Sequence, residues 1–177
     1  MTDRMVTGMF RDRDSAEKAY GYLTTRGYRQ DDVNVMMSDE TRRKHFGDSG
    51  TKKAAETELG SKALEGVGVG AGVGAVTGGV LAAIAAAATI AVPGVGLVVA
   101  GPIAAALVGA GAGGVTGGLI GGLIGAGIPE ERARLYETGV KEGGIVLGVR
   151  PRTDEDADYF EREWKKSRGE HIYGRDW

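Results

Sequence analysis

Apolar and polar positions in the first forty residues predict a strand, a helix and a second strand. Residues 5–10 alternate with the period of two that is typical of a strand. A turn follows, where Asp14 or Ser15 is placed to cap a helix that ends near Gly27. Apolar residues recur along this helix at helical spacing: Ala16, Ala19, Tyr20 and Leu23. Residues 33–37 are predicted to form the second strand, parallel to the first, as in a βαβ unit.

A second group of elements is predicted near the end of the chain. Pro129 begins a helix whose acidic first turn suits the helix dipole, and Gly143 and Gly144 end it. Residues 145–149 form an apolar run that predicts a strand. The following helix begins near Asp154 and carries one apolar stripe: Ala157, Phe160 and Trp164.

Together the two groups predict a small three-stranded domain of the α+β or α/β class, with the order β-α-β and then α-β-α. The domain is split in the sequence between residues 1–38 and 129–168. Residues 39–63 are polar and are expected to be a linker or stalk, and residues 169–177 a tail without a clear period. Residues 64–128 are expected to form a Gly/Ala-rich α-helical hairpin. The two halves can share a sheet only if both ends of this insertion lie close together.

The insertion has a composition unlike the rest of the chain. From Gly66 to Pro129 there is no charged and no aromatic residue, and 20 of these 64 residues are glycine. Two helices are expected, at roughly 64–90 and 103–127, with a connector around Pro93 and a second break at Gly101-Pro102. Each helix would be about 35–40 Å long, enough to cross a hydrocarbon core of about 30 Å.

Glycines recur in the insertion at every fourth position, which places them on one face of each helix. Such a row lets two helix backbones approach closely and is called a glycine zipper. The residues expected to pack helices together and to drive oligomerisation are Gly66, Gly70, Gly74, Gly78, Gly109, Gly113, Gly117, Gly121 and Gly125.

These features predict a non-enzymatic membrane protein that forms homo-oligomers and contacts membrane lipid through its hairpin. Basic residues on both sides of the insertion, among them Arg42, Lys44, Arg132 and Arg134, indicate that both ends of the insertion lie on the cytoplasmic side of the membrane. The first residues lack the apolar core of a signal peptide. The alternative is a soluble, cytoplasmic homo-oligomeric particle with the hairpins buried inside it and a protective or storage role. The absence of an aromatic belt in the insertion favours this alternative.

Other chemistry finds little support in the sequence. There is no cysteine, and the net charge of −2 gives no basic excess for binding nucleic acid. Residues 109–114 match the pattern GxGxxG, but they lie in a glycine row and not at the turn after a strand. His45 and His171 are far apart in polar segments, and the acidic residues at 154–158 suit a helix N-terminus. We therefore expect no catalytic residue, cofactor, metal site, nucleic-acid partner or small-molecule substrate.

Several segments outside the insertion resemble a known family. They are the helix end "RGY", the run "DDVNVMMSD" and, after the insertion, "IPEERARLYETGVKEGGIVLGVR". In these segments the chain resembles the general stress protein family, whose members have a heat-induced YflT-like α/β domain. It resembles the members in which a glycine-zipper insertion interrupts this domain. The resemblance covers most of the chain and implies a bacterial stress-associated protein, so that the expected membrane is the inner membrane of a bacterium. Its motifs are structural, so it implies no active site.

Overall fold

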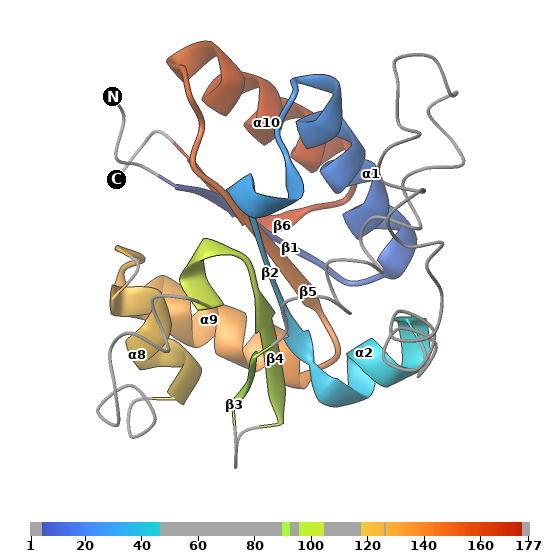
Figure 1. The fold of residues 1–177 in the computed structure, drawn as a ribbon, viewed down its shortest axis with the longest axis vertical. Coiled ribbons are helices and arrows are strands. Elements are labelled where there is room, and N and C mark those ends of the chain that lie inside the picture. The colour runs from blue at the N-terminus through green and yellow to red at the C-terminus, as the bar shows by residue number, and fades with distance from the viewer. Residues whose placement is uncertain (1–4, 47–89, 93–95, 105–117, 126, 175–177) are drawn as a thin grey trace, which may run out of the picture.

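A computed structural model describes residues 5–46, 90–92, 96–104, 118–125 and 127–174 of the chain. These residues form an α+β domain built on one antiparallel sheet (Figure 1). Its strand order in the described part of the chain is β3-β4-β2-β5-β1-β6. The strands are β1 (Val6–Phe10), β2 (Val33–Ser38), β3 (Ile90–Val92), β4 (Leu97–Ala100), β5 (Ile145–Val149) and β6 (Glu170–Tyr173).

Two interleaved βαβ units make the centre of the sheet. Strands β1 and β2 both pair antiparallel with β5, which lies between them, so β1 and β2 run parallel to each other as predicted. Likewise β5 and β6 both pair antiparallel with β1. Helix α1 (Arg13–Thr25) joins the first pair of parallel strands, and α10 (Asp154–Lys166) joins the second. This is the split βαβ arrangement of ferredoxin-like folds.

The two faces of the sheet are covered by different helices. Helices α1 and α10 lie side by side on one face, and α9 (Glu130–Lys141) lies on the other with α8 (Gly118–Gly125) packed against it (Figure 1). Because successive side chains of a strand point to opposite faces, a strand covered on both sides must be apolar throughout. The run at β5 meets this requirement: Ile145 and Leu147 join the core beneath α1 and α10, and Val146 joins the core beneath α9.

Aromatic residues fill the core beneath α1 and α10. Trp164 is fully buried and donates from its indole nitrogen to the carbonyl of Ala19, at 3.1 Å. Its ring packs edge-on against Phe10, with centroids 5.7 Å apart, and is stacked on Phe160. Ala157 is also buried, so the apolar stripe predicted on this helix is confirmed.

The structure corrects the sequence-based expectations outside the central elements. The sheet has six described strands and not three, because residues 90–92 and 97–100 and part of the expected tail add to its edges. The expected linker begins with a helix, α2 (Asp39–Phe46). The cap of α1 is Asp12, whose carboxylate accepts from the backbone N–H of Ser15 at 2.8 Å, and not Asp14 or Ser15. A short 3-10 helix, η1 (Gln30–Asp32), precedes β2.

The largest correction concerns the insertion. Residues around Pro93 were expected to connect two long helices at a distance from the domain. Instead β3 and β4 pair with each other on either side of this point, and β4 pairs with β2. Ile103 and Leu123 lie in the same buried cluster of side chains. Residues 102–104 and α8 are helical, as expected for the second helix; residues 64–89 and 105–117 lie outside the described residues, so the helical hairpin stays a prediction. Among the described residues, no helix combines the length and the apolar character that crossing a membrane requires.

The aromatic core gives a first prediction. Replacing the fully buried Phe160 with alanine leaves a cavity between α10 and the sheet and should lower the free energy of unfolding by about 3–5 kcal/mol. Urea denaturation followed by circular dichroism measures this loss. The control is Leu135→Ala on α9, where the side chain is 38% exposed and the expected loss is below about 1 kcal/mol. Equal losses in the two variants would contradict the core assignment.

Candidate functional site at the junction with the insertion

Asn34 joins the sheet to the inserted residues. It is a buried polar residue within the apolar strand β2, on the face that carries α9. Its side-chain nitrogen donates to the carbonyl of Gly148 on β5 at 3.3 Å, and its side-chain oxygen accepts from the backbone N–H of Ile103 at 2.7 Å. Residues 102–104 are helical, and the first N–H groups of a helix have no partner within it. Asn34 therefore supplies from β2 the acceptor that this helical turn lacks.

The inserted chain passes close to the beginning of β2 at Gly101. Its φ of +94° lies in the left-handed region that glycine adopts most readily. A Cβ atom at this position would overlap the carbonyl oxygen of Val33 and lie 2.9 Å from the Cα of Asn34. Only glycine allows this contact between two backbones. The break predicted at Gly101-Pro102, with a helical turn after it, is confirmed for residues 102–104.

Apolar residues of the insertion complete the core beneath α9. They share one buried cluster with Met36 of β2, Val146 of β5 and Tyr136 of α9. The members contributed by the insertion are Val99, Ile103, Ala104, Leu123 and Ile128. The described parts of the insertion are therefore built into the domain, so residues 47–89 and 105–117 connect segments that all belong to it.

Of the nine glycines predicted to pack helices together, the structure describes two. Gly121 and Gly125 lie four residues apart on α8, and a Cβ atom at either would meet nothing within 4 Å. No described backbone lies against these two glycines. The side chain of Ile124, which lies between them in the sequence, is 44% exposed. The other seven lie outside the described residues: Gly66, Gly70, Gly74, Gly78, Gly109, Gly113 and Gly117.

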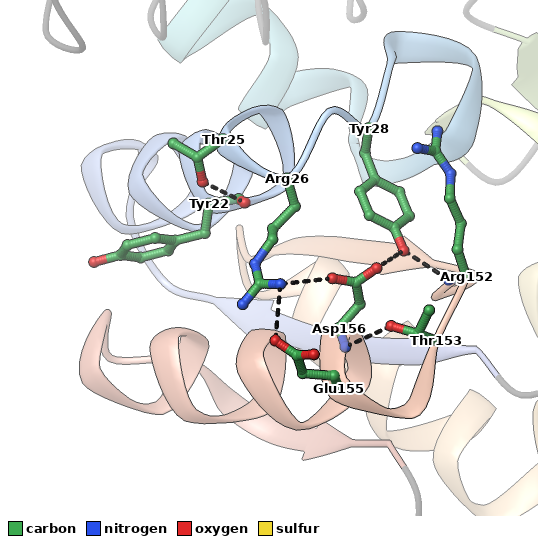
Figure 2. A network of polar contacts seen from close by, with 8 residues as sticks. All are labelled: Tyr22, Thr25, Arg26, Tyr28, Arg152, Thr153, Glu155 and Asp156. Carbon is green, nitrogen blue, oxygen red and sulfur yellow. Dashed lines mark hydrogen bonds and ion pairs between the residues drawn. The ribbon is translucent and has the colours of Figure 1, made fainter.

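A polar network ties the end of α1 to the beginning of α10 (Figure 2). The Tyr28 hydroxyl donates to Asp156 at 2.8 Å and accepts from the backbone N–H of Arg152 at 2.6 Å. Asp156 also forms an ion pair with Arg26 at 3.3 Å. Thr153 caps α10 by accepting from the N–H of Asp156 at 3.1 Å. The groups of this network satisfy one another, which is typical of a structural contact between elements.

Burial shifts the ionisation of the tyrosines in this domain. Burial, together with the hydrogen bond to Asp156, raises the pKa of Tyr28 to about 12, although the N–H of Arg152 opposes the shift. Burial also raises the pKa of Tyr20 to about 12 and raises the pKa of Tyr136. The Tyr136 hydroxyl donates to the carbonyl of His171 at 2.8 Å and is hydrogen-bonded to Thr7 at 2.7 Å. These phenols therefore stay neutral in the fold, and the Tyr136 hydroxyl links β1 to β6.

The candidate groups for catalysis or metal binding are not brought together. In the described ranges no three His, Cys, Asp or Glu side chains are placed to hold a metal ion. The carbonyl of His45 accepts from Arg13, and His171 lies on β6 with a φ of +48°. The acidic residues at the start of α10 include Glu155 and Asp156, which pair with Arg26.

Comparison with known proteins returns no relative: no family model, no curated protein and no solved structure matches this chain. The resemblance to the general stress proteins therefore stays a prediction that depends on the quoted segments alone.

The contact at Gly101 gives a prediction with a matched control. Gly101→Ala introduces a Cβ atom that overlaps the Val33 carbonyl, and it should destabilise the domain in urea denaturation by at least about 2 kcal/mol more than Gly96→Ala. Gly96 also has a positive φ, of +63°, but a Cβ atom there meets no described residue within 4 Å. Its variant therefore tests the backbone strain alone, about 1–2 kcal/mol. Equal effects at the two positions would refute the close approach of the insertion to β2.

The raised pKa of Tyr28 predicts a loss of stability in alkali. A phenol whose pKa is higher in the folded than in the unfolded state stabilises the folded state while it is protonated. For Tyr28 this contribution is complete below about pH 10 and is lost as the pH rises toward 12. Tyr28→Phe should cost about 1–2 kcal/mol near neutral pH, because two hydrogen bonds disappear. It should also reduce the further loss between about pH 8 and pH 11, measured by urea denaturation.

The control for Tyr28→Phe is Tyr22→Phe. Tyr22 lies on α1, and its hydroxyl forms no hydrogen bond with a described residue. We expect this variant to have nearly the unfolding free energy of the wild type at both pH values. A Tyr28→Phe variant with unchanged stability and an unchanged pH profile would contradict a structural role for the network.

Proposed function

We propose that this chain is a non-enzymatic structural protein in which an α+β domain carries glycine-rich segments that associate between copies of the chain. The proposal takes the stress association from the resemblance alone. The observation that carries it is the integration of the insertion into the domain through β4, Ile103 and α8. Residues 47–89 and 105–117 thus leave from and return to one folded platform, which presents them together to a neighbouring copy.

The composition of these segments supports association. Each glycine in a water-exposed helix costs about 0.8–1 kcal/mol relative to alanine. A glycine row is compatible with a stable helix only where close packing of another backbone compensates for this cost. Seven of the nine glycines in the predicted rows belong to residues 47–89 and 105–117.

The end of the second glycine row, which the structure describes on α8, supports the same interpretation. Gly121 and Gly125 have open space beside them, and the exposed Ile124 lies between them in the sequence. Within the described residues, no heavy atom lies within 4 Å of a Cβ atom placed at either glycine, which supports the approach of a second backbone to this face of α8. A homo-oligomer with the glycine-rich segments packed in its interior is therefore our preferred form of the proposal.

Membrane insertion is the second form of the proposal. The 24 residues from 66 to 89 contain no charge, and they are enough for a helix of about 36 Å. Insertion through this segment would still have to return the chain to β3, which belongs to the sheet. In this form the association would take place in the bilayer, at the inner membrane of a bacterium.

Light scattering and sedimentation of the full chain test the proposal. The wild type should form a defined oligomer, and replacing both Gly121 and Gly125 with leucine should shift it to smaller species, because the bulky side chains separate the backbones. Among the described residues, a Cβ atom at either position meets nothing within 4 Å. The matched control replaces the same two glycines with alanine and should keep more of the oligomer.

Two outcomes would change or overturn the proposal. A wild type that stays monomeric at all concentrations, with and without lipid, would overturn association. Flotation with vesicles of phosphatidylethanolamine and phosphatidylglycerol distinguishes the two forms: comigration of the wild type with the vesicles supports membrane insertion. An oligomer that does not comigrate supports the particle.

A further inference from the structure

The junction between the insertion and the sheet forms an open cavity of about 350 Å³. One side is formed by the sheet, with Met5, Asn34 and Arg150, and by the preceding residues Asp31 and Asp32. Pro102, Ile103 and Gly125 of the insertion also line it. Its size is in the range of pockets for small molecules, about 300–1000 Å³. All of these residues lie in the described part of the chain.

Strand register explains why charged residues gather at this cavity. Val149 on β5 pairs with Val33 on β2 on one side and with Val6 on β1 on the other. One step beyond these pairs, Arg150 lies between Asp32 and Met5. Adjacent strands are about 5 Å apart, so the ends of three strands bring a guanidinium, two carboxylates and a thioether to one edge of the sheet.

Two of these charges have no partner among the described residues. Arg150 is exposed and forms no ion pair or hydrogen bond there, and the same is true of the exposed Asp31. Asp32 differs, because its carboxylate pairs with Arg152 at 3.0 Å and accepts from the backbone N–H of Arg29 at 2.8 Å. The cavity therefore offers one uncommitted cation and one uncommitted anion, which do not neutralise each other directly.

The rest of the cavity lining is apolar, and its position is fixed by burial and by a hydrogen bond. Met5 and Ile103 are buried, and the N–H of Ile103 is already bonded to Asn34. Asn34 uses its amide nitrogen on Gly148. The polar groups left for a ligand are thus the two charged side chains, next to a surface suited to a short hydrocarbon group.

We propose that this cavity binds a small zwitterion, namely a free α-amino acid with an apolar side chain. Its carboxylate would pair with the guanidinium of Arg150, a geometry in which arginine can donate two parallel hydrogen bonds. Its ammonium group would pair with Asp31, and its side chain would lie against Met5, Pro102 and Ile103. This proposal does not require the association of the glycine-rich segments, although Gly125 both lines the cavity and belongs to the face of α8 proposed to pack against another copy.

Calorimetric titration of the full chain tests the proposal with matched probes. L-alanine, L-valine, L-leucine and L-methionine are titrated one at a time. 4-Methylpentanoate and 3-methylbutylamine are the analogues of leucine that lack the ammonium and the carboxylate, respectively. At least one amino acid should bind, and each single-charge analogue of leucine should bind at least about tenfold more weakly than leucine.

Variants assign the two charges. Arg150→Gln and Asp31→Asn should each weaken amino-acid binding by at least about tenfold. The controls are Arg162→Gln and Asp14→Asn, at exposed positions on α10 and α1, and they should bind like the wild type. Failure of all four amino acids to bind at millimolar concentration would overturn the proposal. Equal binding of leucine and 4-methylpentanoate would also overturn it, because the cavity would then be a site for anions. Unchanged binding in Arg150→Gln would refute the assignment as well.

Discussion

The approach of the Gly101 backbone to the beginning of β2 determines where the insertion lies. Two main chains meet there without a side chain between them, and Asn34 adds the hydrogen bond that holds Ile103. A buried amide side chain destabilises a fold unless its nitrogen and oxygen form hydrogen bonds. In Asn34 both atoms do so, to Gly148 and Ile103. The position of β4, the apolar cluster beneath α9 and the cavity beside Arg150 all depend on this contact.

The elements with strong periodicity were predictable from the sequence. Strand β5, the apolar stripe of α10 and the helix that begins after Pro129 lie where the pattern places them, because each is covered on a face that the residue spacing defines. The sheet edges were missed for the opposite reason. Strands β3 and β6 have only three and four residues, and His171 adopts a positive φ within β6, so no alternation develops.

The candidate site was partly visible in the sequence. The break at Gly101-Pro102 was identified, but a turn signal does not reveal which distant strand the chain will contact. The one clue to the contact was Asn34, a polar residue within the apolar run of β2, where asparagine is normally disfavoured. Arg150 and Asp31 could not be identified, because their proximity depends on the pairing of β2 with β5 across the whole insertion.

The interleaving of the two βαβ units also determines the order in which the sheet can assemble during synthesis. Strand β1 emerges from the ribosome before the other described strands, yet its two neighbours in the described sheet, β5 and β6, are the last of them to emerge. The backbone N–H and C=O groups of β1 therefore stay without their sheet partners until β5 and β6 have been synthesised. Non-local strand pairing of this kind folds slowly. A nascent chain released early would expose an unpaired apolar strand, the type of surface that chaperones retain.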